Sequence, residues 1–308
     1  MVDDRAGACH VALFGPNRGG ADARENARRG TGQPSAPADM KTSAGERRTP
    51  ASAGNGQDGL RAVVLAGGQG TRLRPYTTVI PKPLVPVGER PVLEHIIRSL
   101  AKCGVDRVDL CVNYLGDLIL VYLAQIDLPP ELRLAFHWED EPLGTAGALR
   151  MVPDLEGTFI AMNGDVLTTL DYADLLAFHR RQDAALTIAM HSKRVDIDLG
   201  VIESQDGLVR DYIEKPSKHY QVSMGVYVYE ERALRYLPPE GPCQFPDLVL
   251  SLLAAGERVA AYECDADWFD IGTVHEHERA VVDVERFPEK YDLEAPMLDP
   301  HDLSRTFE

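Results

Sequence analysis

The sequence lacks any long hydrophobic run: among its 308 residues, the stretch Leu118–Ala124 is one of the longest. A membrane-spanning helix needs about 18 consecutive apolar residues. The first fifteen residues include acidic side chains and have no sustained apolar core, which a secretion signal would contain. We therefore expect no membrane span, no membrane partner and no secretion signal.

Cysteine is scarce and irregularly spaced. The five cysteines form no CxxC pair, so we do not expect a thiolate zinc site. They are Cys9, Cys103, Cys111, Cys243 and Cys264. An odd number without regular spacing favours free thiols and a reducing, cytoplasmic location.

Positive charge is also in short supply. The chain carries 32 Lys and Arg against 48 Asp and Glu, which gives a net charge of −16 at neutral pH. Residues 1–58 are nearly balanced, with eight basic and seven acidic residues, so the remaining sequence holds 24 against 41. An acidic body repels nucleic acid, and we expect no nucleic-acid partner. A phosphorylated substrate would require positive charge concentrated in a pocket.

The N-terminal segment differs in composition from the rest. Residues 1–58 contain one aromatic residue and no isoleucine. Such a segment cannot bury enough apolar surface to offset its ordering entropy, so we predict a disordered N-terminal extension. Met40 is an alternative start of translation, and the sequence leaves both starts open. We predict one folded domain over residues 59–287 and a C-terminal tail over residues 288–308.

Within the predicted domain, strand-like and helix-like segments alternate. An apolar strand at 61–66 precedes a glycine-rich turn, and residues 92–103 place apolar side chains on one helical face. This alternation predicts an α/β fold with a Rossmann-like, mostly parallel central sheet and helices on both faces. From residue 186 onwards, strand-like runs follow one another with few helices between them. We expect them to form an antiparallel β extension that builds the second wall of a cleft.

The glycine-rich turn, LAGGQGTRL at Leu65–Leu73, follows the first strand directly. Glycines let backbone N–H groups approach an anion closely, and ligands bind at the carboxyl ends of parallel strands. The turn fits neither the GxxxxGK[ST] phosphate loop nor the GxGxxG dinucleotide pattern. Arg72 and Arg74 lie within or just after it, and Lys82 stands between two prolines that hold the backbone extended. The pattern favours a phosphate-binding loop over a simple chain turn.

Two aspartates, Asp165 in NGD and Asp270 in WFDIGT, follow strand-like segments. Mg²⁺ prefers oxygen ligands and often uses one or two carboxylates, with water and substrate phosphates completing its shell. Either aspartate alone is more typical of a turn or a helix cap. Their pairing as metal ligands depends on the resemblance described next.

Seven motifs stand in a characteristic order: LAGGQGTRLRPYT, PKPLVPV, PVLEHII, EPLGTAGAL, NGD, IEKP and WFDIGT. Over about residues 60–283 the sequence resembles the sugar-1-phosphate nucleotidyltransferases. That family includes mannose-1-phosphate and heptose-1-phosphate guanylyltransferases and glucose-1-phosphate thymidylyltransferases. The resemblance implies an enzyme that binds a nucleoside triphosphate and a sugar 1-phosphate, or a sugar-like cyclitol phosphate. It would transfer the nucleoside monophosphate, release pyrophosphate and use Mg²⁺ as its cofactor.

The resemblance also implies roles for individual positions. Lys82 would act at the α-phosphate and Arg72 at the leaving pyrophosphate, while Asp165 and Asp270 would hold Mg²⁺. The nucleotide would contact Leu65, Ala66, Gly67, Gly68, Gly70, Thr71, Arg72, Glu139 and Gly144. The sugar phosphate would contact Gly200, Glu214, Lys215 and Gly225, so that the antiparallel extension forms the sugar side of the cleft.

Departures from the family pattern bear on the base and the sugar. The GTAGAL form is more similar to the guanylyltransferases, and Glu139 stands where the thymidylyltransferases place a glutamine. A carboxylate only accepts hydrogen bonds, and guanine offers two adjacent donors, which favours GTP. A solvated acidic turn at Glu139–Glu141 is the alternative. After IEKP, VSMG replaces the family's Asn-Ala-Gly segment, so the large Met224 would reshape the sugar pocket.

Assembly and function each leave alternatives open. The sequence shows no hexapeptide repeat of the C-terminal β-helix found in many relatives, so we expect any homo-oligomer to form without that module. An inactive paralogue that binds a nucleotide sugar and regulates a partner is one rival, and a GT-A-type glycosyltransferase is another. The phosphate and metal set, Arg72, Lys82, Asp165, Lys215 and Asp270, favours an enzyme. The NGD motif offers one aspartate instead of a DxD-like cluster, which disfavours the glycosyltransferase.

Overall fold

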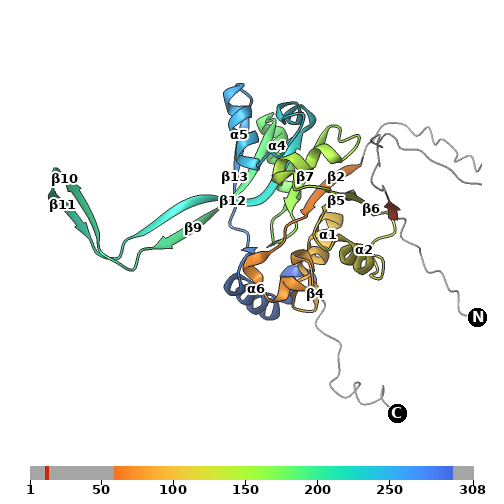
Figure 1. Cartoon of the computed structure of the whole chain (residues 1–308), viewed down its shortest axis with the longest axis horizontal. Helices are drawn as coiled ribbons and strands as arrows, with labels where there is room; N and C mark the ends of the chain where they lie inside the picture. The colour runs from red at the N-terminus through yellow and green to blue at the C-terminus, as the bar shows by residue number, and fades with distance from the viewer. Residues whose placement is uncertain (1–10, 14–58, 294–308) are drawn as a thin grey trace, which may run out of the picture. The chain divides into compact units, whose positions relative to one another are not determined.

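The structure, a computed structural model, describes residues 11–13 and 59–293, which belong to one compact unit. Its centre is an eight-stranded sheet with the order β1-β6-β5-β2-β7-β12-β9-β13 (Figure 1). These strands are β1 (Val11–Leu13), β2 (Leu60–Ala66), β5 (Val105–Val112), β6 (Arg133–Trp138), β7 (Thr158–Asn163), β9 (Leu186–Asp196), β12 (Ser217–Glu230) and β13 (Val259–Glu263). Two-stranded pairs are formed by β3 (Pro86–Val87) with β4 (Arg90–Pro91), β8 (Val166–Thr168) with β14 (Trp268–Asp270), and β10 (Val201–Gln205) with β11 (Leu208–Ile213).

Most neighbours in the large sheet are parallel. Strands β1, β6, β5, β2 and β7 pair in parallel, as do β9 and β13. Only β12 runs the other way, antiparallel to both β7 and β9. The predicted α/β fold with a mostly parallel sheet is therefore confirmed.

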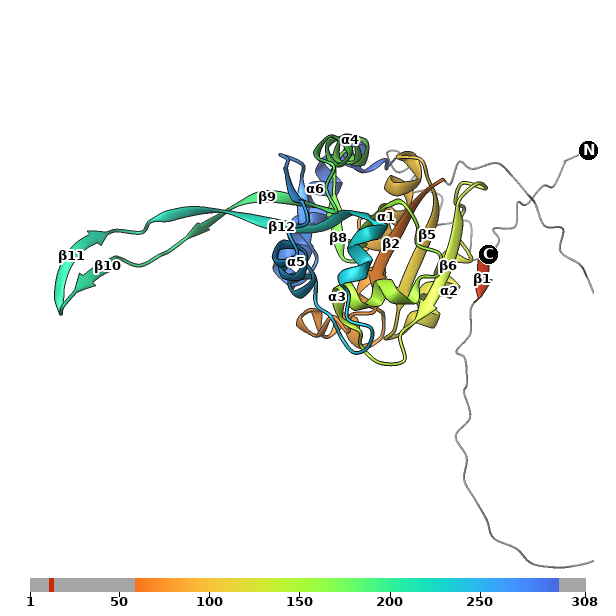
Figure 2. The ribbon, with the colours of Figure 1, turned by 90° about the horizontal axis from the view of Figure 1, so that it is seen from above.

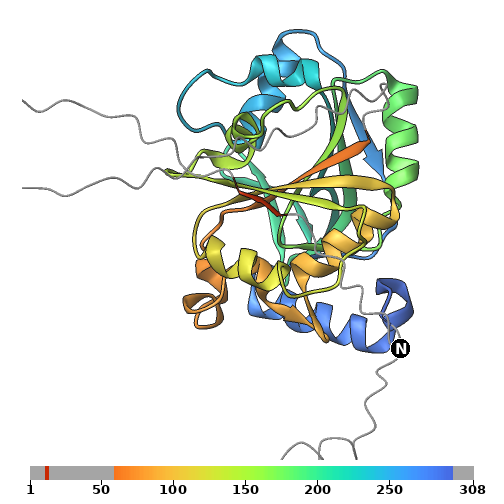
Figure 3. The same ribbon diagram turned by 90° about the vertical axis from the view of Figure 1, so that its right-hand side faces the viewer.

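Helices cover both faces of the sheet. They are α1 (Val92–Lys102), α2 (Gly116–Leu123), α3 (Gly144–Gly147), α4 (Tyr172–Gln182), α5 (Phe245–Ala254) and α6 (Val274–Arg286). Alternate side chains of a strand point to opposite faces. Accordingly, Val64 of β2 lies in one buried cluster with α1, α2 and α6, and Val63 lies in another with α3 and α5. Figure 3 shows the helices on both faces of the sheet. None of the helices in the described ranges is long and apolar enough to cross a membrane.

Short 3-10 turns connect these elements. They are η1 (Thr71–Leu73), η2 (Tyr76–Thr78), η3 (Lys82–Leu84), η4 (Ala148–Met151), η5 (Glu231–Tyr236) and η6 (Pro288–Tyr291). The predicted domain boundary at residue 287 lies inside the packed structure, because Tyr291 of η6 is buried in the core. At the other end, Val11–Leu13 of the predicted disordered extension form β1, which pairs with β6. The remainder of that extension and residues 294–308 of the predicted tail lie outside the described residues.

The outer parts of β9 and β12 and the hairpin between them form a long two-stranded arm, defined here as residues 192–221 (Figure 2). It consists of the outer halves of β9 and β12 followed by the β10–β11 hairpin. None of its residues is buried. The sequence predicted its antiparallel pairing, but the arm does not form a wall of the pocket described below.

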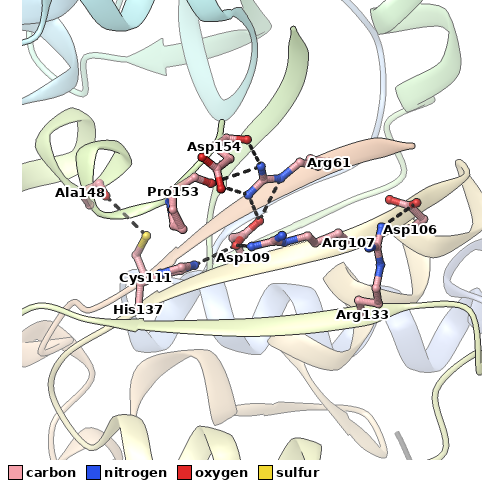
Figure 4. Close-up of polar contacts among 10 residues, drawn as sticks. All are labelled: Arg61, Asp106, Arg107, Asp109, Cys111, Arg133, His137, Ala148, Pro153 and Asp154. Carbon is pink, nitrogen blue, oxygen red and sulfur yellow. Dashed lines mark hydrogen bonds and ion pairs between the residues drawn. The ribbon is translucent and has the colours of Figure 1, made fainter. Parts of the chain in front are cut away.

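A buried carboxylate, Asp109, links three neighbouring strands (Figure 4). It accepts hydrogen bonds from Arg61 of β2 at 2.8 Å and from Arg107 of its own strand β5 at 2.9 Å. The Nε2 atom of His137 on β6 lies 2.8 Å from the same carboxylate. Burial alone would raise the pKa of Asp109, but the hydrogen bonds from His137, Arg61 and Arg107 outweigh it and lower the pKa. Asp109 is therefore ionised, and it joins β2, β5 and β6 beneath the site.

We predict that Asp109→Asn lowers the free energy of unfolding by about 3–5 kcal/mol, because it leaves two largely buried guanidinium groups without their counter-charge. As a control, Arg133→Gln breaks the exposed Arg133–Asp106 ion pair and should cost less than about 1 kcal/mol. Urea denaturation at neutral pH checks both values.

The same comparison has a pH dependence. The folded-state pKa of Asp109 is lowered, so its stabilisation is complete above the unfolded-state pKa and is lost as the pH falls through the folded-state pKa. The difference between wild type and Asp109→Asn should therefore shrink in strong acid. The prediction would be contradicted if the free energies of unfolding of wild type and Asp109→Asn differed by the same amount at neutral pH and in strong acid. It would also be contradicted if Asp109→Asn lost no more stability at neutral pH than Arg133→Gln does.

Candidate active site

The glycine-rich loop begins where β2 ends, at the carboxyl edge of the sheet. Gly70 adopts a left-handed conformation (φ +60°), and its carbonyl accepts hydrogen bonds from the Leu73 amide at 3.0 Å and the Thr77 hydroxyl at 2.7 Å. A Cβ atom on Gly68 would meet no atom within 4 Å, so the backbone there is open to a ligand. The loop is thus fixed at its far end and accessible at its start.

Lys82 lies between the two aspartates that the sequence singled out. It is the first residue of η3 and is buried, with 8% of its surface exposed. Its Nζ atom forms an ion pair with Asp165 and lies 3.9 Å from Oδ1 of Asp270. The Ile271 amide donates to the Asp165 carbonyl at 3.0 Å, which holds the two aspartate segments together. Distant parts of the chain therefore bring one cation and two carboxylates to one point.

The charges around Asp270 affect its pKa in opposite directions. Burial and the neighbouring Asp165 carboxylate raise the pKa of Asp270, whereas Lys82 and Arg72 act in the opposite direction. A Cβ atom on Gly272 would lie 3.1 Å from Nη2 of Arg72, which places the guanidinium beside the Asp270 segment. The net upward shift of its pKa means that the ionised Asp270 carboxylate would be stabilised by further positive charge.

Glu139 lies against the other side of the glycine-rich loop. Its Oε2 atom accepts a hydrogen bond from the Leu143 amide at 3.0 Å, and a Cβ atom on Gly67 would lie 3.0 Å from its Oε1 atom. Burial raises the pKa of Glu139, although the Leu143 hydrogen bond opposes that shift. The Glu139 side chain is therefore half-buried. The Leu143 amide binds its Oε2 atom, and its Oε1 atom faces Gly67.

Gly144 starts α3 in a conformation that other residues rarely adopt, with φ +78°. A Cβ atom there would lie 2.6 Å from the carbonyl oxygen of Cys243. That same carbonyl accepts hydrogen bonds from the amides of Ala146 and Gly147, both at 3.0 Å. Glycine at position 144 thus allows α3 to pack directly on the chain that leads into α5.

These elements enclose a cavity of about 260 Å³. Eight predicted site residues line it: Leu65, Ala66, Gly67, Gly68, Lys82, Glu139, Gly144 and Asp165. The sequence did not single out Pro83, Pro142, Thr145, Ala148, Asn163, Gly164 or Gln244 as site residues, although they line the same cavity. Asn163 and Gly164 belong to the NGD motif, which was a usable signal. Gln244 precedes α5 and carries no local motif.

Five further predicted residues lie outside the lining. Asp270 and Arg72 adjoin it through the contacts described above, and Gly70 packs against Lys82, whose Cβ would be 3.0 Å from a Cβ on the glycine. Gly225 (φ +75°) faces Asn163, so its assigned place is beside the cavity. Thr71 is exposed in η1. Met224 is fully buried in the core and does not line the cavity, and its effect on a sugar pocket stays a prediction.

The remaining three predicted sugar-side residues lie together on the arm. Tyr212 donates a hydrogen bond to Glu214 at 3.0 Å, and its hydroxyl occupies the space where Gly200 would carry a Cβ atom. Lys215 follows with φ +46°. The structure therefore groups Gly200, Glu214 and Lys215, but none of them lines the cavity.

The donor set at the cavity fits a magnesium ion. Asp165 and Asp270 both approach the Lys82 ammonium group, so their carboxylates face a common space that now holds one positive charge. Within the described ranges, no group of three or more His, Cys, Asp or Glu side chains is suitably placed for a metal. Two carboxylates completed by substrate phosphates are a usual Mg²⁺ arrangement.

The fold and the site define a class of protein. Residues 61–286 match the model of the nucleotidyl transferase family, and the chain belongs to that family. The chain is similar to the mannose-1-phosphate guanyltransferase of Schizosaccharomyces pombe, with 30% identity over 69% of this chain and 61% of that protein. It is also similar to the mannose-1-phosphate guanylyltransferase catalytic subunit beta of Dictyostelium discoideum, with 31% identity over the same shares of the two chains. The chain thus spans about three fifths of the length of these curated relatives.

Among solved structures, HddC from Yersinia pseudotuberculosis is similar to this chain, with 27% identity and a TM-score of 0.56. The match covers 73% of this chain and 99% of HddC. A second HddC structure, a complex with GMP-PN, matches with 26% identity and the same TM-score.

We predict that Gly144→Ala destabilises the fold more than Gly256→Ala does. Both glycines have φ +78°, which costs alanine about 1–2 kcal/mol, but a Cβ atom on Gly256 would meet no atom within 4 Å. The alanine at position 144 must in addition displace the Cys243 carbonyl. Chemical denaturation of the two variants measures the difference. Equal losses would show that α3 and the Cys243 segment separate without cost.

Proposed function

We propose that this protein is a sugar-1-phosphate nucleotidyltransferase that transfers a nucleoside monophosphate, preferentially from GTP, to a sugar 1-phosphate and releases pyrophosphate. A sugar-like cyclitol phosphate is an alternative acceptor. The observation that carries the proposal is the junction of a glycine-rich loop, a buried lysine and two aspartates at one edge of the sheet. Family membership and the names of the curated relatives support the same reaction class.

In the proposed reaction, an oxygen of the sugar phosphate attacks the α-phosphorus of the triphosphate, and the bond to the leaving pyrophosphate breaks. A phosphate oxygen is already a nucleophile, so this chain need only position the groups and neutralise developing charge. Lys82 is buried at the cavity wall and acts as a point charge at the α-phosphate. Arg72 is exposed beside Gly272, and its guanidinium can bind two oxygens of the pyrophosphate.

Asp165 and Asp270 would hold Mg²⁺, which would supply charge neutralisation at the phosphates. In the described structure, both carboxylates share Lys82. With both carboxylates engaged by Mg²⁺, the Lys82 ammonium group would be available to the substrate phosphate. Lys82 would thus contact the two aspartates before substrate binds and the substrate phosphate afterwards.

The preference for GTP depends on Glu139. The carboxylate is half-buried beside the start of the glycine-rich loop, and its Oε1 atom faces Gly67. Guanine presents two adjacent N–H donors, whereas adenine presents a single exocyclic amine beside an acceptor. The HddC structure in complex with GMP-PN supports a guanine nucleotide as the donor.

A pyrophosphate-release assay tests the reaction class. Five nucleoside triphosphates would be combined with a panel of sugar 1-phosphates and cyclitol phosphates in the presence of Mg²⁺. The proposal requires pyrophosphate release with at least one pair. Binding of a nucleotide sugar, measured by calorimetry, without release from any pair would instead support the inactive regulatory paralogue.

We expect Lys82→Ala to lower kcat by roughly two or more orders of magnitude, because the charge at the α-phosphate is needed mainly as the transition state forms. The KM for the triphosphate should change much less, since the glycine-rich loop and Arg72 still bind the other phosphates. Lys102→Ala is the matched control, because Lys102 is an exposed lysine paired only with Asp292. A normal kcat with a raised KM would reassign Lys82 to ground-state binding.

We expect Glu139→Gln to narrow the preference for GTP over ATP by roughly ten- to a hundredfold, which corresponds to about 1–3 kcal/mol for an unpaired buried acceptor. Overall turnover should fall less than this ratio. Glu141→Gln is the control, because Glu141 is exposed and does not line the cavity. An unchanged GTP/ATP ratio in Glu139→Gln, or a wild type that prefers another triphosphate, would remove the base assignment and leave the reaction class intact.

A further inference from the structure

Gln244 lines the cavity, and none of the roles described above uses its side chain. The residue precedes α5, and with Asp247 it forms a capping box at the start of that helix. In a capping box the side-chain oxygen of the first residue turns toward the free backbone amides of the helix. The other end of the carboxamide, the Nε2 atom, lies 2.9 Å from the position of a Cβ atom on Gly144. Gln244 therefore presents a hydrogen-bond donor beside Gly144.

The backbone on both sides of Gln244 is bonded to the segment that starts α3. Before it, the Cys243 amide donates to the Leu143 carbonyl at 2.8 Å. After it, the Phe245 amide donates to the Thr145 hydroxyl at 2.9 Å. These bonds hold the Gln244 side chain at one place relative to α3. A group that is positioned in advance loses less freedom when it binds a ligand.

Glu139 is attached to the same segment. Its Oε2 atom accepts from the Leu143 amide at 3.0 Å, and the Nε2 atom of Gln244 adjoins the next residue, Gly144. Within the part of the chain that the structure describes, the Nε2 atom of Gln244 donates no hydrogen bond. The Gln244 side chain is also exposed, so a ligand can reach it. One acceptor and one donor thus adjoin consecutive residues of the cavity wall.

The other polar side chains of the cavity have different surroundings. Six lining side chains can form hydrogen bonds: Lys82, Glu139, Thr145, Asn163, Asp165 and Gln244. Lys82 and Asp165 form the ion pair at the proposed phosphate site, and Asn163 belongs to the same NGD motif as Asp165. The Thr145 hydroxyl binds the Phe245 amide. Glu139 and Gln244 remain as the two that adjoin residues 143–144.

We propose that Gln244 determines the choice of base together with Glu139. The Nε2 atom of Gln244 donates a hydrogen bond to O6 of guanine, while the Glu139 carboxylate accepts from the N1–H and N2–H groups. The proposal rests on the proposed function, because it takes the cavity to hold the nucleoside triphosphate. It adds to the base assignment a second contact that can be tested separately from Glu139.

Guanine matches this order of donor and acceptor at every position. Its O6 atom accepts, and the neighbouring N1–H and N2–H groups donate. Adenine and cytosine present an amine in place of O6 and an unprotonated ring nitrogen beside it, so both side chains would face a group of their own kind. Uracil and thymine match at the first two positions, but they carry a second carbonyl where guanine has its N2 amine. Gln244 therefore opposes adenine and cytosine, and Glu139 opposes all three alternatives to guanine.

A nucleotide with sulfur in place of O6 tests the contact directly. The readout is kcat/KM for pyrophosphate release with GTP divided by kcat/KM with 6-thio-GTP, because sulfur accepts a hydrogen bond only weakly. In wild type this ratio should be about three to ten, since the Gln244 donor loses its partner. In Gln244→Ala it should fall to about one, because no donor is left. Circular dichroism verifies that the variant is folded.

ITP, which lacks the N2 amine, gives the converse test. The ratio of GTP to ITP depends on Glu139, so it should fall in Glu139→Gln and stay at the wild-type value in Gln244→Ala. The ratio of GTP to 6-thio-GTP should respond in the opposite way. Gln125→Ala is the matched control, because Gln125 is exposed and does not line the cavity. It should leave both ratios unchanged.

A third variant, Gln244→Glu, keeps the length of the side chain and replaces the donor with an acceptor. The new carboxylate opposes O6 of guanine and accepts from the adenine amine, so the preference for GTP over ATP should fall at least about tenfold. The added negative charge acts on both triphosphates and cancels in this ratio.

Three results would each overturn the proposal. They are a wild-type ratio of GTP to 6-thio-GTP near one, the wild-type ratio retained in Gln244→Ala, and an equal loss of the ratio in Gln125→Ala. Failure of the proposed function gives a different result. If wild type releases no pyrophosphate with any acceptor, the reaction class fails, and the calorimetric dissociation constants for GTP and 6-thio-GTP decide the role of Gln244. If GTP neither reacts nor binds, the base assignment and the role of Gln244 fail together.

Discussion

The parallel pairing of β2 with β5 and β7 is the constraint on which the site depends. The register sets Leu65 opposite Asn163 on one side and Ala66 opposite Val112 on the other. The segments that follow these strands therefore meet at one edge, and the Gly164 amide donates to the Leu65 carbonyl at 2.8 Å. A Cβ atom on Gly164 would lie 3.0 Å from that carbonyl. The close approach requires glycine, and it brings Asp165 next to the loop that begins at Gly67.

Local patterns in the sequence predicted much of this arrangement. The strand at 61–66, the helix ending before Gly104 and the glycine-rich turn each follow from nearest neighbours in the chain, and the structure has them at nearly the same bounds. The contribution of Gln244 could not be predicted in this way. It reaches the cavity because Gly144 and the Cys243 segment pack together across a hundred residues, a contact that depends on volume and not on any motif. The position of the arm was missed for a related reason. Alternation of side chains indicates a strand but does not say which surface its exposed face will meet.

Acidic side chains are neutralised differently in the interior of the sheet and beside the cavity. Asp109 is neutralised by two arginines on the amino side of the sheet, which uses buried positive charge to hold β2 and β5 in place. At the carboxyl edge the balance is reversed, because among the described residues the cation within 4 Å of both Asp165 and Asp270 is the single lysine Lys82. An acidic protein can attract a phosphorylated ligand only if a cation compensates these carboxylates. Lys82 supplies part of that compensation, because its ammonium group approaches both Asp165 and Asp270.

The cavity and the arm are built by different physical means. The cavity is fixed by strand register and glycine contacts in the sheet, where little can move without breaking backbone hydrogen bonds. The arm, in contrast, has backbone pairing but no buried residue of its own. Its stability therefore depends on its backbone ladder, because no core packs against it.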